Sequence, residues 1–83
     1  MITKQKYYEI FNDAKRAFLD ITGCFERIKY IENLINEATN GDENELKNLF
    51  EIGQDEGHIA KKVKYSRDNL IESLIMAITS LLV

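Results

Sequence analysis

Apolar side chains recur every three to four residues along most of this chain, which is the spacing of one face of an α-helix. The densest stretch is residues 70–83, where Glu72 and Thr79 lie opposite a wide apolar arc. A helix with so wide an apolar arc contacts more than one neighbour. We therefore expect residues 70–83 to form the central helix of a bundle.

The first helix is predicted to begin just after Thr3, whose hydroxyl can cap a helix N-terminus. Ile2 and Tyr7 stand at the two positions of a hydrophobic staple around that cap. The apolar face of this helix comprises Tyr7, Ile10, Phe11, Ala14, Ala17, Phe18 and Ile21.

A second helical stretch covers residues 25–38, and its relation to the first depends on Gly23. This glycine can end the first helix and leave Thr22 to cap another. The stretch also continues the apolar phase of the first one, so a single helix with one tolerated glycine stays open. The residues that continue the phase are Phe25, Ile28, Ile31, Ile35 and Ala38.

The clearest break in the chain is Asn40-Gly41, a strong turn dipeptide, followed by Asp42 as a helix cap. Glu45 stands where the reciprocal residue of a capping box belongs. The helix that follows has an apolar side formed by Leu46, Leu49, Phe50 and Ile52.

Gly53 and Gly57 flank polar residues, which favours a turn over residues 53–57. Both glycines also fit the helical phase, so a continuous helix that offers a flat strip to a neighbour stays open. From His58 onward the spacing predicts one long final helix, with a candidate interruption at Ser66-Arg-Asp-Asn69.

These elements predict an all-α fold with residues 1–83 as a single domain. We favour a small antiparallel bundle of about four helices, with turns near residues 22–24, 40–43 and 53–57. The alternative is a hairpin of two long helices that buries its apolar stripe by dimerising.

Composition agrees with a small globular protein, since 45% of the residues are hydrophobic, 30% are charged and proline is absent. The only cysteine, Cys24, excludes an internal disulfide and fits a reducing compartment. With no basic-then-apolar leader at the start, we expect a cytoplasmic protein. The apolar run of residues 70–83 is shorter than the roughly 20 residues of a membrane span and contains Glu72, so no span is predicted.

Enzymatic patterns are mostly missing from the sequence. His58 is the only histidine, which disfavours His-based triads and zinc sites with two histidines. Asp55 and His58 have the spacing of one half of a di-iron motif, but we interpret His58 as an exposed residue. Cys24 next to Phe25 is interpreted as a buried packing residue. We predict a protein that is not an enzyme and that holds no metal or cofactor.

Charge is unevenly distributed, because residues 32–56 hold eight of the acidic side chains and Lys47 as their only basic one. An acidic surface is attracted to a basic patch, such as the channel of a nucleic-acid-handling protein. The leading hypothesis is a protein–protein interaction module, a small acidic regulator or inhibitor of the phage or mobile-element type. A face that only maintains solubility is the simpler interpretation. The predicted partner-binding residues are Glu37, Asp42, Glu43, Glu45, Glu51, Asp55 and Glu56.

Two alternatives use other parts of the chain. A structural or assembly subunit would self-associate, as a homodimer or within a larger complex, through Leu74, Ile75, Ile78 and Leu82. A nucleic-acid-binding hairpin would use the basic cluster, where an aromatic ring stands among four cations. The acidic pI of about 5.1 disfavours nucleic acid as the partner. The residues of the basic cluster are Lys61, Lys62, Lys64, Tyr65 and Arg67.

Overall fold

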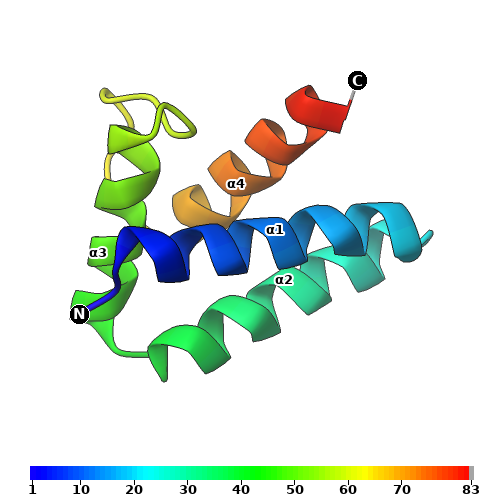
Figure 1. The fold of residues 1–83 in the computed structure, drawn as a ribbon, viewed down its shortest axis with the longest axis horizontal. Helices are drawn as coiled ribbons and strands as arrows, with labels where there is room; N and C mark the ends of the chain where they lie inside the picture. The colour runs from blue at the N-terminus through cyan, green and yellow to red at the C-terminus, as the bar shows by residue number, and fades with distance from the viewer. Residues whose placement is uncertain (83) are drawn as a thin grey trace.

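The computed structural model describes residues 1–82, which form four α-helices and no strand (Figure 1). The helices are α1 (Lys4–Asp20), α2 (Cys24–Thr39), α3 (Glu43–Asp55) and α4 (Arg67–Leu82). The predicted all-α bundle with turns near residues 22–24 and 40–43 is confirmed. Breaks at 21–23 and 56–66 make the hairpin of two long helices wrong for the described part of the chain.

Helices α1 and α2 form an antiparallel pair, and α3 runs crosswise at their open end (Figure 1). Helix α1 begins as predicted, because the Thr3 hydroxyl accepts a hydrogen bond from the backbone N–H of Lys6 at 3.1 Å. It ends at Asp20, where Ile21 becomes extended. Gly23 therefore lies in the connection and is the N-cap residue of α2.

Asp42 caps α3 as predicted, since its carboxylate accepts hydrogen bonds from the backbone N–H groups of Asn44 and Glu45. The reciprocal half of the capping box is not formed. The backbone N–H of Asp42 donates instead to the carbonyl of Thr39, and the Glu45 carboxylate pairs with the amino group of Met1 at 3.0 Å. The chain start is thereby attached to the first turn of α3.

The predicted turn at residues 53–57 begins later than expected, because α3 continues through Asp55. Gly53 lies inside the helix and is buried, and a Cβ atom there would be 2.7 Å from Cδ1 of Ile59. The glycine thus permits the close approach proposed for a continuous helix. The reversal itself occurs at Gly57, whose φ of 80° suits a residue without a Cβ.

Residues 56–66 form an irregular segment, so the prediction of one long final helix from His58 is wrong. The segment returns over the end of α3, where Ile59 is buried and the Gln54 side chain donates to the carbonyls of Ala60 and Val63. Helix α4 begins only after Ser66, whose hydroxyl accepts from the backbone N–H of Asn69 at 3.0 Å. The sequence signal at Ser66–Asn69 is therefore the real helix start.

All four helices contribute to one hydrophobic core, but α1 rather than α4 is the central helix. Helices α1 and α3 each pack against the other three, α1 more extensively, whereas α2 and α4 make only marginal contact with each other. The expectation that residues 70–83 form the centre is therefore wrong. The apolar arc of α4 is only partly used, and its four buried residues are Leu70, Ile71, Leu74 and Ile78.

None of the helices within residues 1–82 combines the length and the apolar character needed to cross a membrane.

Replacement of Gly53 by alanine is expected to lower the free energy of unfolding by about 1–3 kcal/mol, through overpacking against Ile59. Alanine gains about 1 kcal/mol over glycine in a helix, and the clash at 2.7 Å outweighs this gain. Urea denaturation measures the change. Ile59→Val removes the Cδ1 atom that meets the new Cβ, so the double variant should be more stable than the two single effects predict. Strict additivity would contradict this explanation.

Candidate docking surface

The side chain of His58 is packed into the N-terminal part of α1, contrary to its interpretation as an exposed residue. Its ring stacks on Phe11 with centroids 4.2 Å apart, and its Nδ1 is hydrogen-bonded to the Tyr7 hydroxyl at 2.8 Å. Burial raises the pKa of Tyr7 and lowers the pKa of His58. No local sequence pattern predicts this pairing, because 51 positions separate the two residues.

A second link joins α1 to the end of α3 beside this cluster. The Tyr8 hydroxyl donates to Oε1 of Glu56 at 2.6 Å, and the amino group of Lys4 lies 3.4 Å from Oε2. The hydrogen bond from Tyr8, followed by the charge of Lys4, holds the pKa of the Glu56 carboxyl below its usual value. Both links hold residues 56–58 against α1, which is a structural role.

Acidification is expected to destabilise the protein through His58. Its pKa is lower in the folded chain than the 6.5 of an unperturbed histidine, so the unfolded chain binds more protons between the two values. Stability is therefore complete above about pH 6.5 and falls as the pH decreases through the folded-state pKa. Among neighbouring charges, Glu56 opposes the lowering and Lys15 adds to it.

Urea midpoints at about pH 7.5 and about pH 5.5 measure this effect. In His58→Gln the amide oxygen can still accept from the Tyr7 hydroxyl, but the side chain does not titrate. The variant should lose less stability than the wild type between the two pH values. Equal losses would assign the acid sensitivity to other groups.

The seven predicted acidic residues do not form one open patch. Asp55 and Glu56 have partners within the chain, Asp55 pairing with Lys61 at 3.1 Å, and Glu45 and Asp42 are used as described above. The acidic residues of α3 extend from its N-cap Asp42 to Asp55 in its last turn, a span of about 20 Å at 1.5 Å per residue. Apart from the helix cap Asp42, the exposed members without a salt bridge in residues 1–82 are Glu37, Glu43 and Glu51.

The basic cluster is likewise engaged in internal contacts. Tyr65 packs edge-on against Phe50 with centroids 5.5 Å apart, and the amino group of Lys47 lies over its ring. Burial, and then the nearby Glu43 carboxylate, raises the pKa of Tyr65 to about 12. Arg67 donates to the side chain of Asn36. Lys62 and Lys64 are exposed, but Tyr65 does not present an open face for stacking with a base.

The four residues predicted for self-association divide into two pairs. Leu74 and Ile78 are 2% and 0% exposed, so they belong to the core of the subunit and are covered by the chain itself. Ile75 is half-buried and Leu82 is 40% exposed, and both line a hollow on the α2 side of α4.

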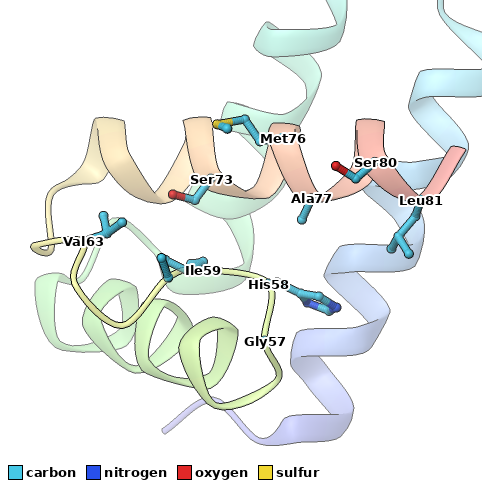
Figure 2. Close-up of a pocket in the computed structure, with 10 residues that line it drawn as sticks. Gly57, His58, Ile59, Val63, Ser73, Met76, Ala77, Ser80 and Leu81 are labelled. Atoms are coloured by element: carbon cyan, nitrogen blue, oxygen red, sulfur yellow. The ribbon is translucent and has the colours of Figure 1, made fainter. Parts of the chain in front are cut away.

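A hollow of about 430 Å³ lies on the other side of α4, against the irregular segment. Figure 2 shows His58, Ile59 and Val63 on the segment side and Ala77 and Leu81 on the helix side. Ser73 and Ser80 of α4 also line it. The imidazole of His58 is already committed to Tyr7 and Phe11, so this hollow offers no activated nucleophile of the Ser–His kind.

A further open apolar surface lies between α2 and α4, the two helices that make only marginal contact with each other. One hollow of about 400 Å³ is lined by Phe18, Cys24, Arg27, Ile28, Ile75, Thr79 and Leu82. A second hollow of about 340 Å³ is lined by Ile28, Glu32, Asp68, Ile71, Glu72 and Ile75. Ile28 and Ile75 belong to both, so the two hollows form one surface that we call the α2–α4 groove.

Large apolar side chains are exposed in and near this groove. Ile28 is 41% exposed and Leu82 40%, while Phe25, the chain neighbour of Cys24, is 69% exposed. Cys24 is exposed as well, so its interpretation as a buried packing residue is wrong, and Phe25, which continues the predicted apolar phase, is not buried either. Ile31 and Ile35, further along the same predicted face of α2, are buried, so only the start of that face at Cys24, Phe25 and Ile28 is left exposed.

Two ends of the groove differ in charge. Glu32, Asp68 and Glu72 surround one end, and none of them forms a salt bridge within residues 1–82. At the other end Arg27 lies over the ring of Phe18 at 5.1 Å and donates to the carbonyl of Ile21. That guanidinium supports the α1–α2 connection.

Comparison with protein families, curated proteins and solved structures found no match to this chain. The acidic end of the groove was missed in the sequence because Glu32 is 36 and 40 positions away from Asp68 and Glu72, which lie one turn apart on α4. No local signal pointed to this end, because only the packing of the helices brings Glu32 of α2 beside Asp68 and Glu72 of α4.

Proposed function

We propose that this protein is a non-enzymatic protein–protein interaction module that binds its partner at the α2–α4 groove. The observation that carries the proposal is the exposed apolar lining, with Ile28 41% and Leu82 40% exposed beside a hollow of about 400 Å³. Covering apolar surface contributes roughly 25 cal/mol per Å². Clustered apolar side chains on a soluble domain are characteristic of an interaction site.

The acidic surface of α3 supports a secondary role in the same function. Glu45, Asp55 and Glu56 are balanced by Met1, Lys61 and Lys4, so their charges are partly neutralised within the chain. The net charge of −3 still attracts a basic partner over a distance, which increases the rate of encounter. We further propose that the partner is a nucleic-acid-handling protein, which this chain regulates or inhibits.

Assembly with a second copy is the competing function, and exposed Leu82 with half-buried Ile75 favours it. Both residues line the α2–α4 groove, so the same surface would be covered in either case. The two functions differ in the protein that covers it.

Site-specific photo-cross-linking in cells of the source organism tests the proposal. A photoreactive phenylalanine analogue replaces Ile28 in one variant and Glu51 in a matched control, because both residues are exposed but only Ile28 lines the groove. We expect an adduct of defined mass with a different protein from position 28. The control at position 51 should give about tenfold less of that adduct.

Two outcomes would contradict the proposal. Equal adduct from positions 28 and 51 would show that the groove is not the binding surface. If the adduct from position 28 contains only a second copy of this chain, the protein is a self-assembling subunit and not a module that binds a different protein.

A further inference from the structure

We infer that the partner segment that occupies the α2–α4 groove is an amphipathic helix with basic residues on the flank that faces Glu32, Asp68 and Glu72. This inference rests on the proposed function and names the chemistry of the partner. It follows from three features of the groove: its walls, its charges and its apolar floor.

The walls of the groove are two helices, so the occupant must satisfy its own backbone. Helices use their backbone N–H and C=O groups internally, and neither α2 nor α4 offers a sheet edge to an extended peptide. A helix brings no unpaired backbone groups into an apolar groove. Because the groove is lined by residues 24–32 of α2 and 68–82 of α4, roughly 12 and 21 Å, a helix of two to four turns can lie along it.

The charges at one end select a basic partner. Glu32, Asp68 and Glu72 surround Ile28, Ile71 and Ile75, so each carboxylate lies close to the apolar floor. Lysine or arginine side chains beside the apolar anchors of a docked helix would pair with them. The same carboxylates repel the phosphates of nucleic acids and of anionic lipids, which disfavours both as occupants.

A second copy of this chain fits the groove less well. A two-fold contact sets the same patch of both copies against itself. The acidic ends of both grooves would then share one interface, while Arg27 is held by Phe18 and Ile21. The basic cluster of residues 61–67 cannot serve as the docked helix, because most of it lies in the irregular segment.

Fluorescence anisotropy with synthetic peptides tests the inference. The probe is a labelled amphipathic helix of about 18 residues, with leucine on one face and lysine on the other. A second probe has glutamate in place of every lysine. We expect the lysine peptide to bind the wild-type protein at least about tenfold more tightly than the glutamate peptide at physiological salt.

Matched charge variants show where the lysine peptide binds. Glu32→Lys combined with Glu72→Lys should weaken its binding by about tenfold or more, because attraction becomes repulsion. Glu37→Lys combined with Glu51→Lys changes the net charge equally but outside the groove, and should weaken binding by less than about threefold. Glu32→Gln with Glu72→Gln should give an intermediate loss, and thermal melting verifies that each variant is folded.

The alkylation rate of Cys24 gives an independent reading, since this exposed thiol lines the groove. The lysine peptide should slow its reaction with N-ethylmaleimide in proportion to occupancy. Equal losses in the two charge-reversed variants, or equal affinity for both peptides, would overturn the basic helix. If alkylation slows as the protein concentration rises without any peptide, and sedimentation shows a dimer, the occupant of the groove is a second copy of this chain and not a basic helix.

These outcomes are distinguishable from failure of the proposed function. Cross-links from Ile28 to another protein, together with equal affinity for both peptides, would retain the interaction surface and reject only its basic partner. Absence of cross-links from Ile28 would reject the surface itself.

Discussion

Replacement of Leu70 by alanine is expected to lower the free energy of unfolding by about 2–5 kcal/mol, a large fraction of the stability of so small a domain. Leu70 is 0% exposed and lies in the first turn of α4, within the core shared by all four helices. Its truncation leaves a cavity where α4 packs against the rest of the bundle. Chemical denaturation measures the loss.

Leu81 provides the matched control on the same helix. It is 57% exposed, so Leu81→Ala removes the same atoms from a surface that is largely open to solvent. We expect a change of at most about 0.5–1 kcal/mol. Similar losses for both variants would mean that the C-terminal part of α4 is packed as tightly as its start, in conflict with the exposed apolar surface described here.

Replacement of Tyr7 by alanine is the second change with a large expected effect, about 3–5 kcal/mol. Tyr7 is 1% exposed, its hydroxyl is hydrogen-bonded to His58, and its ring stacks with that of Phe11. The substitution removes both the core volume and the hydrogen bond that holds the irregular segment against α1. Amide hydrogen exchange in residues 56–66 should increase together with the loss of stability.

Two further variants separate these contributions. Tyr7→Phe retains the ring and should cost about 1–3 kcal/mol, because the partner nitrogen of His58 is left without its hydrogen bond. Tyr30→Ala, at a position 43% exposed on α2, should cost less than about 1 kcal/mol. An effect of Tyr7→Ala no larger than that of Tyr30→Ala would contradict the anchoring role of Tyr7.

Local sequence signals were sufficient for most helix boundaries. Thr3 and Asp42 cap helices because the physics of a cap involves only the next three residues. The turn at Asn40-Gly41 is equally local, with positive φ at both residues. The second half of the capping box failed at Glu45, because the amino group of Met1, distant in sequence, pairs with its carboxylate.

Signals that depend on tertiary contacts were ambiguous in the sequence. Gly53 lies within a helix, and the absence of a Cβ atom lets Ile59 pack closely against it. The local sequence around Gly53 does not reveal this contact. Residues 58–65 have helical spacing but are held irregular by Gln54 and by the burial of Ile59. In residues 58–65, tertiary contacts therefore outweigh the helical spacing of the apolar residues.

The candidate site was also only partly predictable. The sequence identified an apolar face on the last helix and an acidic surface, and Ile75 and Leu82 do line the α2–α4 groove. The groove became visible only with the arrangement of α2 and α4, because Ile28 and Ile75 are neighbours in space alone. Asp68 and Glu72, which are not among the seven predicted partner-binding residues, line the groove, whereas the predicted Asp55 and Glu56 are paired within the chain.

Whether a partner covers the α2–α4 groove is measured by the alkylation rate of Cys24 in cells of the source organism. The protein is kept at its native expression level, and the rate is compared with that of the purified protein. A Cys24→Ser, Glu51→Cys variant corrects for reagent consumption, because position 51 is exposed outside the groove.

We expect alkylation at position 24 to slow by about tenfold or more in the cell relative to position 51, since a bound partner excludes the reagent. An equal cell-to-purified ratio at positions 24 and 51 would show that the groove is open in the cell and that no partner covers it.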